Sequence, residues 1–246
     1  MAGLLMTWRP FLAQLWAVLS SHDETTPRGC VWWSRVSSAI LWLDEFLRGH
    51  SGTLTRIFTL EAYLNEGDKV EITGDASPWG LGAVLTVNGM VVAWYSDALV
   101  KGTDDRLLKH ILGSPDGQQV WEVLAILVAL RLWKDRWLSK RVRLCVRGDS
   151  ITMLTLLLKM RPKPGVEGLT LLAQEMALDI ADTVYVPDVA EHVPGVANVG
   201  PDVLSRRFAP RTPGTPAWEL PARLAGVDGC TAPLRDESYY RTMRPR

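Results

Sequence analysis

Hydrophobic residues in the first 65 positions recur every three or four residues, which is the spacing of an amphipathic helix. They form two groups, one within residues 11–19 and one within residues 40–47, separated by a polar stretch at residues 20–29. A helix stop follows at residues 48–52. We therefore expect two helices in an N-terminal flank, residues 1–66, which carries no constellation of chemically reactive side chains.

From residue 70 the pattern becomes that of β-strands. Apolar runs at residues 70–75, 82–87 and 90–95 predict three strands, and Asn88-Gly89 separates the last two. Because both residues tolerate positive φ, an Asn-Gly pair between apolar runs is a strong hairpin signal. Three antiparallel strands should follow one another here, and the apolar stretch at residues 118–137 should then form a buried helix.

The rest of the chain alternates between strand and helix patterns. Residues 141–147 alternate apolar and basic side chains, residues 150–160 and 168–182 have helical spacing, and residues 183–189 predict a fifth strand. A short helix should start near Pro201 and run to residue 207. Residues 209–246 are rich in proline and glycine, so we expect an extended, flexible tail. The central domain should therefore span residues 67–208.

Charge limits how this chain could bind nucleic acid. The 27 basic and 27 acidic residues cancel, so binding must depend on a local basic face. Two clusters qualify, the first containing Arg141, Arg143 and Arg147 and the second Lys159, Arg161 and Lys163. The alternative is that they are a solvated strand edge and a helix end.

Cysteine usage favours a reducing compartment. The three cysteines are far apart and odd in number, which supports neither a disulfide framework nor a zinc site. The apolar start, residues 4–19, is interrupted by Arg9-Pro10 and Gln14, so we expect neither a signal peptide nor a membrane span. An intracellular protein is expected, in either the cytoplasm or the nucleus.

Four acids carry the candidate chemistry: Asp75 at the first strand's end, Glu122 at the start of the buried helix, Asp149 after the fourth strand and Asp202 in the last helix. Clustered carboxylates suit hard cations such as Mg²⁺ and Mn²⁺. Each acid also has an ordinary alternative role. These are a turn former for Asp75, a helix start for Glu122, a helix N-cap for Asp149 and a first-turn acid for Asp202.

Taken together, these positions resemble the type-1 ribonuclease H domains, and among them those attached to reverse transcriptases of retroelements. The resemblance covers about residues 70–207 and is most specific in four blocks: Thr73-Gly-Asp75-Ala-Ser77 with the following Gly80-Leu-Gly82, Trp121-Glu122, Arg147-Gly-Asp149-Ser150, and His192-Val-Pro-Gly195 through Asn198 and Asp202 to Arg206. The flank looks like the thumb or connection region upstream of such domains. Departures are Gly148, where serine or threonine is usual, Gly200-Pro201 before the last acid, and a long insertion at residues 96–117.

The resemblance implies an α/β fold, a five-stranded mixed sheet of three antiparallel and then two parallel strands, flanked by helices. It also implies two Mg²⁺ ions, replaceable by Mn²⁺, on either side of a scissile phosphate. Asp75 would bridge the ions, Glu122 and Asp149 would complete one shell, and Asp202 the other. The implied activity is endonucleolytic cleavage of the RNA strand of an RNA–DNA hybrid, leaving 5′-phosphate and 3′-hydroxyl ends.

The same resemblance assigns the accessory residues and partners. His192 would assist proton movement or product departure from a mobile loop, and Ser77 and Asn198 would contact the substrate. For His192 and Asn198 the alternatives are a solvated side chain and a turn residue. The polymerase part of a reverse transcriptase is a possible partner, and no membrane partner is expected.

Two other functions stay open at this point. The first is an inactive ribonuclease H-like relic or structural module of a retroelement polyprotein, since no Tyr-x-Asp-Asp polymerase run is present. The second is a DNA-cutting relative of the integrases, which the spacing of His192 and Asp202 fits less well.

Overall fold

The computed structural model describes residues 2–20, 25–50, 64, 66–137, 142–163, 165–182, 189–211, 213–214 and 216–243. The described α-helices are α1 (Ala2–Ser20), α2 (Trp33–Leu47), α4 (Asp104–Leu108), α5 (Gln118–Leu132), α6 (Ile151–Lys159), α7 (Glu167–Asp182) and α8 (Val199–Ser205). The described strands are β1 (Asp68–Ser77), β2 (Gly80–Val87), β3 (Met90–Ala98), β4 (Val142–Gly148), β5 (Val189–His192) and β6 (Asp228–Cys230).

These strands form one mixed sheet in the order β5-β4-β1-β2-β3-β6. β1, β2 and β3 pair antiparallel, while β4 runs parallel to β1 and β5 runs parallel to β4. The turn between β2 and β3 has positive φ at Asn88 and Gly89, as the Asn-Gly pair predicted. The expected α/β fold, a mixed sheet of three antiparallel and then two parallel strands flanked by helices, is confirmed, with a sixth strand added to the five expected.

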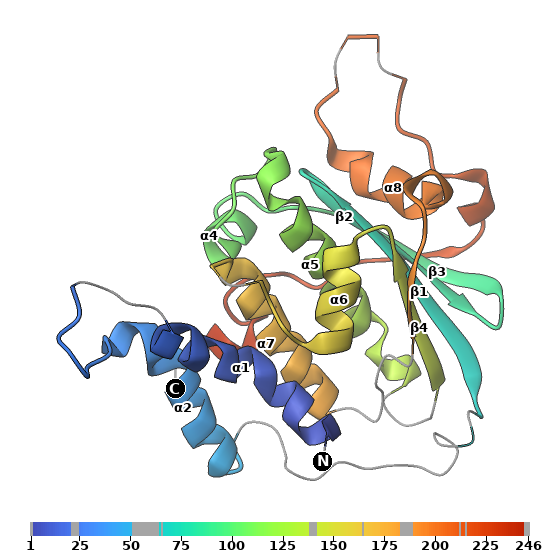
Figure 1. The fold of residues 1–246 in the computed structure, drawn as a ribbon. Helices are drawn as coiled ribbons and strands as arrows, with labels where there is room; N and C mark the ends of the chain where they lie inside the picture. Colours follow the sequence, from blue (N-terminus) through green and yellow to red (C-terminus); the bar gives the residue numbers. More distant parts are fainter. Residues whose placement is uncertain are drawn as a thin grey trace.

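The two faces of the sheet carry different helices. α5 and α6 pack on one face, α7 packs against both of these helices, and α1 and α2 lie outside α7 (Figure 1). The main core between sheet and helices includes the fully buried Trp121, Ile126 and Leu144. α8 packs on the opposite face, where Leu204 contacts Val84 and Leu224.

The N-terminal helices join the domain through a separate aromatic cluster. Phe11 stacks on Trp42 with ring centroids 3.5 Å apart, and both pack with Phe46 against Ala177 and Leu178 of α7. Both predicted helices of the flank are therefore present, and they are attached to the outer side of α7. Within the described residues, no helix is both long and apolar enough to cross a membrane.

The expectation of a flexible tail is wrong for its second half. Residues 228–230 add β6 beside β3, and Arg235 and Tyr240 are buried at 2% and 0% exposure. Arg235 forms ion pairs with Asp97 and Asp104, and the backbone N–H of Arg241 donates to Glu175. The proline and glycine content did predict irregular backbone, but buried ion pairs to distant residues anchor it.

The predicted fifth strand can be compared with the structure only in part. Residues 183–188 lie outside the described residues, and β5 begins at Val189, where the predicted strand ends. The described strand therefore lies later in the chain than expected and ends at His192.

Candidate active site

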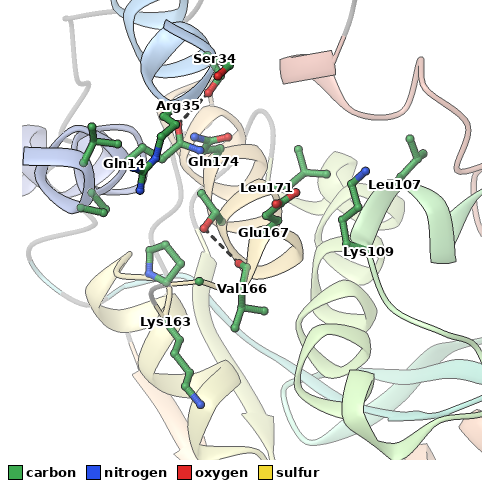
Figure 2. A pocket seen from close by; sticks show the side chains of 17 residues that line it. Gln14, Ser34, Arg35, Leu107, Lys109, Lys163, Val166, Glu167, Leu171 and Gln174 are labelled. Carbon is green, nitrogen blue, oxygen red and sulfur yellow. Dashed lines mark hydrogen bonds between the residues drawn. The ribbon is translucent and has the colours of Figure 1, made fainter. Parts of the chain in front are cut away.

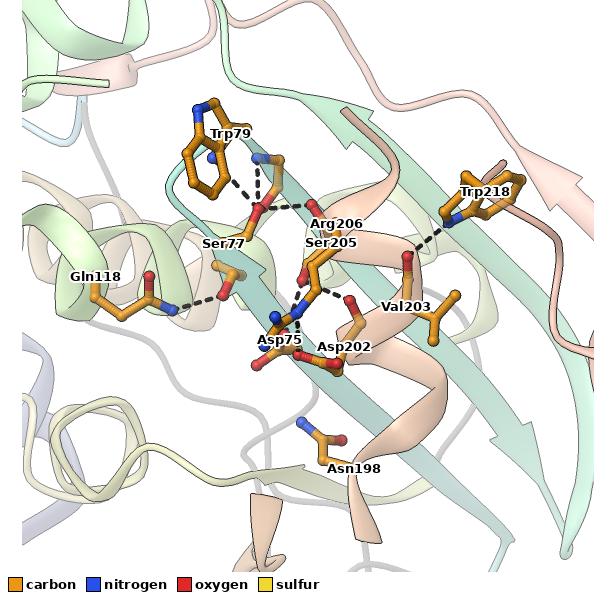
Figure 3. A network of polar contacts seen from close by, with 12 residues as sticks. Asp75, Ser77, Trp79, Gln118, Asn198, Asp202, Val203, Ser205, Arg206 and Trp218 are labelled. Atoms are coloured by element: carbon orange, nitrogen blue, oxygen red, sulfur yellow. Dashed lines mark hydrogen bonds and ion pairs between the residues drawn. The ribbon is translucent and has the colours of Figure 1, made fainter. Parts of the chain in front are cut away.

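Asp75 lies at the centre of the candidate site. It is inside β1, paired with Gly82 of β2, rather than at a turn. Side chains alternate across a strand, so Gly74 faces α5 while Asp75 faces α8. The Ser205 hydroxyl donates a 2.8 Å hydrogen bond to the Asp75 carboxylate, which is only 7% exposed (Figure 3). The alternative role of Asp75 as a turn former is therefore excluded.

Two glycines, Gly74 in β1 and Gly82 in β2, let the helices that carry Glu122 and Asp202 pack closely against these strands. A Cβ added at Gly74 would lie 2.5 Å from Ile126 of α5, and one at Gly82 would lie 2.6 Å from Leu204 of α8. Such distances are far below van der Waals contact. These two glycines therefore set the positions of Glu122, on α5, and Asp202, on α8, relative to Asp75.

Asp149 reaches the same edge of the sheet through strand pairing. β4 runs parallel to β1 with Thr73 opposite Arg147, so Asp149, two residues further on, comes level with Asp75. The N-cap of α6 is Ser150, whose hydroxyl accepts a hydrogen bond from the backbone of Met153. The capping role that we considered for Asp149 is thus performed by its neighbour.

Glu122 is held by two polar side chains. Gln118, one turn earlier in α5, donates to the Glu122 carboxylate at 3.2 Å and to the carbonyl oxygen of Ala76. Ser150 also donates to Glu122. Burial raises the pKa of Glu122, while the bonds from Ser150 and Gln118 oppose this and the charge of Asp149 adds to it. Sequence reasoning missed the positioning role of Gln118, although its spacing of four residues from an acid in a helix is a usable signal.

Asp202 is open to solvent, unlike Asp75. Its side chain is 37% exposed and forms a 2.7 Å ion pair with Arg206, four residues later. The carbonyl oxygen of Asp202 also accepts from Ser205, so α8 presents both a carboxylate and the hydroxyl that contacts Asp75. The bonding roles of Ser205 and Arg206 did not follow from the sequence.

The accessory residues His192 and Ser77 are in different situations. His192 ends β5 opposite Gly148 and is exposed. The Ser77 hydroxyl donates to the Ser205 carbonyl oxygen at 2.7 Å and accepts from the backbone of Gly80, so its bonding groups are already used within the protein. A direct substrate contact by Ser77 stays a prediction that would need these bonds to rearrange.

Asn198 is different because one of its polar atoms has no partner. Its side chain is 1% exposed, and its amide nitrogen donates to the carbonyl oxygen of Gly74 at 3.3 Å. Its oxygen, Oδ1, is buried and accepts no hydrogen bond from any described residue. A buried acceptor without a donor is energetically costly, so a bound donor or cation near it would stabilise the site.

The charges of the other three acids act on Asp75. The pKa of Asp75 is raised to about 7, mainly by burial and further by the charges of Asp149, Asp202 and Glu122, while the Ser205 hydrogen bond opposes the rise. All three companions are therefore near enough to repel Asp75. Even so, no three His, Cys, Asp or Glu side chains in the described ranges are already arranged to hold a metal ion.

A stability measurement tests this repulsion directly. In the presence of a chelator, Asp75→Asn should stabilise the protein at about pH 8 and have little effect at about pH 4. A carboxyl whose pKa rises on folding destabilises the folded state as pH increases from the ordinary value of 3.8 through about 7. Full ionisation costs up to about 4 kcal/mol. Urea titrations at both pH values check this, and equal stability differences at the two would contradict it.

Comparison with known proteins yields structural matches at low sequence identity. No protein-family model and no curated protein match the chain. The structure is similar to a ribonuclease H1 from the halophilic archaeon Halobacterium salinarum NRC-1, with 21% identity, a TM-score of 0.39 and coverage of 55% of this chain and 93% of that one. It is also similar to a ribonuclease H1 isolated from compost by a metagenomic approach, with 18% identity, a TM-score of 0.39 and coverage of 56% and 93%.

A third match covers more of this chain. It is a foamy viral protease-reverse transcriptase (dRH) in complex with double-stranded DNA, with 19% identity, a TM-score of 0.32 and coverage of 76% of this chain and 32% of that one. Strand order and pairing define the fold of this chain independently of these matches.

Proposed function

We propose that this chain is a metal-dependent endonuclease that hydrolyses the RNA strand of RNA–DNA hybrids, as the ribonuclease H part of a retrotransposon reverse transcriptase. The observation that carries the proposal is the buried Asp75 carboxylate, whose pKa is raised by burial and by the charges of Asp149, Asp202 and Glu122. Keeping four acids together without a cation destabilises a protein, so a role in binding divalent metal explains the arrangement best.

The donor groups fit a hard divalent cation. Mg²⁺ and Mn²⁺ prefer oxygen ligands, and carboxylate oxygens are supplied by Asp75, Glu122, Asp149 and Asp202. The unpartnered oxygen of Asn198 lies beside β1, the strand that carries Asp75. When bound, two such ions would activate a water molecule and stabilise the departing oxygen of a phosphodiester. The carboxylates are now held by Ser205, Gln118, Ser150 and Arg206, so we expect side-chain rotations on metal binding.

The remaining residues would orient the substrate and handle protons. The exposed His192 at the end of β5 lies opposite Gly148, one residue before Asp149, so it is placed to exchange protons with solvent near the site. Asn198 would accept a hydrogen bond from substrate or bound water through Oδ1. Discrimination of RNA from DNA would depend on the ribose 2′-hydroxyl, which is what distinguishes the two backbones.

Cleavage of a labelled hybrid tests the proposal. With Mg²⁺ the protein should cut the RNA strand and leave single-stranded RNA, the DNA strand and plain duplex DNA intact, and chelator should stop the reaction. Preferential cutting of duplex DNA would instead favour the integrase-like alternative, and equal cutting with and without chelator would rule out metal dependence.

A second candidate function, an inactive relic or structural module, is favoured by one observation. Arg206 already pairs with Asp202 at 2.7 Å, so this carboxylate has a cationic partner within the protein itself. Arg206→Gln distinguishes the two functions. In a nuclease it should strengthen metal binding or leave it unchanged, whereas in a relic metal binding should be absent before and after the change.

A further inference from the structure

The outer helix α1 and the segment after α6 enclose two adjoining hollows. One, of about 520 Å³, lies between α1, α2 and the start of α7, and the other, of about 680 Å³, lies between α1 and residues 161–163. They share Ala13, Ala17, Pro162 and Lys163, so they form one continuous depression. We call it the α1 groove.

Positive charge dominates the α1 groove. Its lining includes five cationic side chains and a single acid: Arg9, Arg35, Lys109, Arg161 and Lys163 against Glu167. Figure 2 shows Arg35, Lys109, Lys163 and Glu167 among the residues that line the first hollow. Because the whole chain has no net charge, this is a local concentration of charge that favours an anionic partner.

The groove also presents an aromatic side chain to solvent. Trp16 lines the second hollow, and 69% of its surface is exposed. Trp8, by contrast, packs on Trp42 and Phe46 in the aromatic cluster that attaches α1 to the domain. Trp16 therefore makes no contribution to that cluster, and an exposed indole between cations is suited to stacking on a nucleobase.

The groove's position relative to the acids follows from α6. This helix begins beside Ser150, which contacts Glu122, and ends at Lys159, whose carbonyl oxygen accepts a 3.1 Å hydrogen bond from Arg9 of α1. Its nine residues span about 13 Å. At the duplex spacing of about 3.4 Å per nucleotide, this length corresponds to roughly four nucleotides.

We propose that the α1 groove binds single-stranded nucleic acid, with Arg9, Arg161 and Lys163 on the phosphates and Trp16 stacked on a base. A basic groove with an exposed aromatic side chain is the usual arrangement for holding single strands without sequence preference. The route of the strand from the acids rests on the proposed nuclease function. The binding itself does not, and it can be measured without cleavage.

The test is fluorescence anisotropy of a labelled single-stranded oligodeoxythymidine with the full chain, in chelator, over a series of salt concentrations. Arg161→Ala/Lys163→Ala should flatten the slope of log affinity against log salt by about 1.4, the effect of losing two phosphate contacts on a single strand. Trp16→Ala should weaken binding about tenfold, and Trp16→Phe should restore most of it. Lys134→Ala/Arg136→Ala removes two exposed cations outside the groove and should change neither quantity.

The outcomes separate the groove from the nuclease site. The proposal is overturned if the groove variants bind single strands as the Lys134→Ala/Arg136→Ala control does. It is also overturned if the wild type binds blunt duplex more tightly than single strand and Trp16→Ala has no effect on binding. Circular dichroism establishes that each variant is folded. If the protein cleaves hybrids but neither groove variant weakens strand binding, the nuclease proposal stands and the groove proposal fails. If the protein binds single strands through the groove but does not cleave hybrids, the groove proposal stands and the nuclease proposal fails.

Discussion

Asp75→Asn should reduce cleavage of the RNA strand of a hybrid by on the order of 10³-fold or more. Asp75 is the acid on which the other three act, so in the proposed function its carboxylate contributes to holding both cations. Losing the several kcal/mol that a bound ion gives to the transition state lowers the rate by about this factor. The change is nearly isosteric, and the oxygen of the introduced amide can still accept the hydrogen bond from Ser205.

This variant separates catalysis from folding in an unusual way. The repulsion around Asp75 predicts that Asp75→Asn is more stable than the wild type when metal is absent, so lost activity cannot be attributed to unfolding. Asp135→Asn is the matched control, because it removes one charge from an exposed side chain away from the four acids and should leave the rate unchanged. Initial rates with saturating Mg²⁺ measure both, and comparable rates for the two variants would reject the assigned role of Asp75.

Arg235→Ala should destabilise the protein by about 3 to 5 kcal/mol. The side chains of Arg235 and Asp104 are both buried, so removing the guanidinium leaves a buried carboxylate without its cation. The loss also removes the bond from Arg235 to the carbonyl oxygen of Ala98 at the end of β3. Since β6 lies five residues before Arg235 and pairs with β3, we expect the attachment of the tail to weaken as well.

Two further variants make the Arg235 prediction specific. Arg106→Ala also breaks an ion pair between the tail and the domain, with Glu237, but that pair is more than half exposed and should cost at most about 1 kcal/mol. Asp104→Asn combined with Arg235→Met removes both charges of the Arg235–Asp104 pair and should recover part of the stability lost in Arg235→Ala. The oxygen of the introduced amide can still accept the hydrogen bond that the backbone N–H of Val100 donates to Asp104. Urea titrations give all three values, and a small effect of Arg235→Ala would contradict the anchoring role.

The tail shows where sequence reasoning failed and why. Proline and glycine correctly predicted irregular backbone, but the partners of Arg235 lie more than 130 residues earlier, at Asp97 and Asp104. A single arginine in a polar stretch belongs to no periodic pattern, so the sequence does not predict that Arg235 is buried. Strands β1 to β3, in contrast, were predictable because alternation and the Asn88-Gly89 turn are local signals.

The same distinction between local and distant signals applies to the site. Each of the four acids belongs to a recognisable short motif, so their candidacy could be stated from the sequence. The bond from Ser205 to Asp75 joins residues 130 positions apart, and it depends on how closely α8 packs against Gly82. The helix cap, which the sequence offered as an alternative role for Asp149, is formed by the adjacent Ser150.

The most direct test of the central claim is calorimetric titration of the full chain with Mn²⁺ at about pH 8, where the Asp75 carboxyl is ionised. If the four acids form one cation site, the wild type should bind Mn²⁺, Asp75→Asn should lose most of that binding, and Asp135→Asn should match the wild type. Absence of binding by the wild type, or equal binding by wild type and Asp75→Asn, would contradict the account.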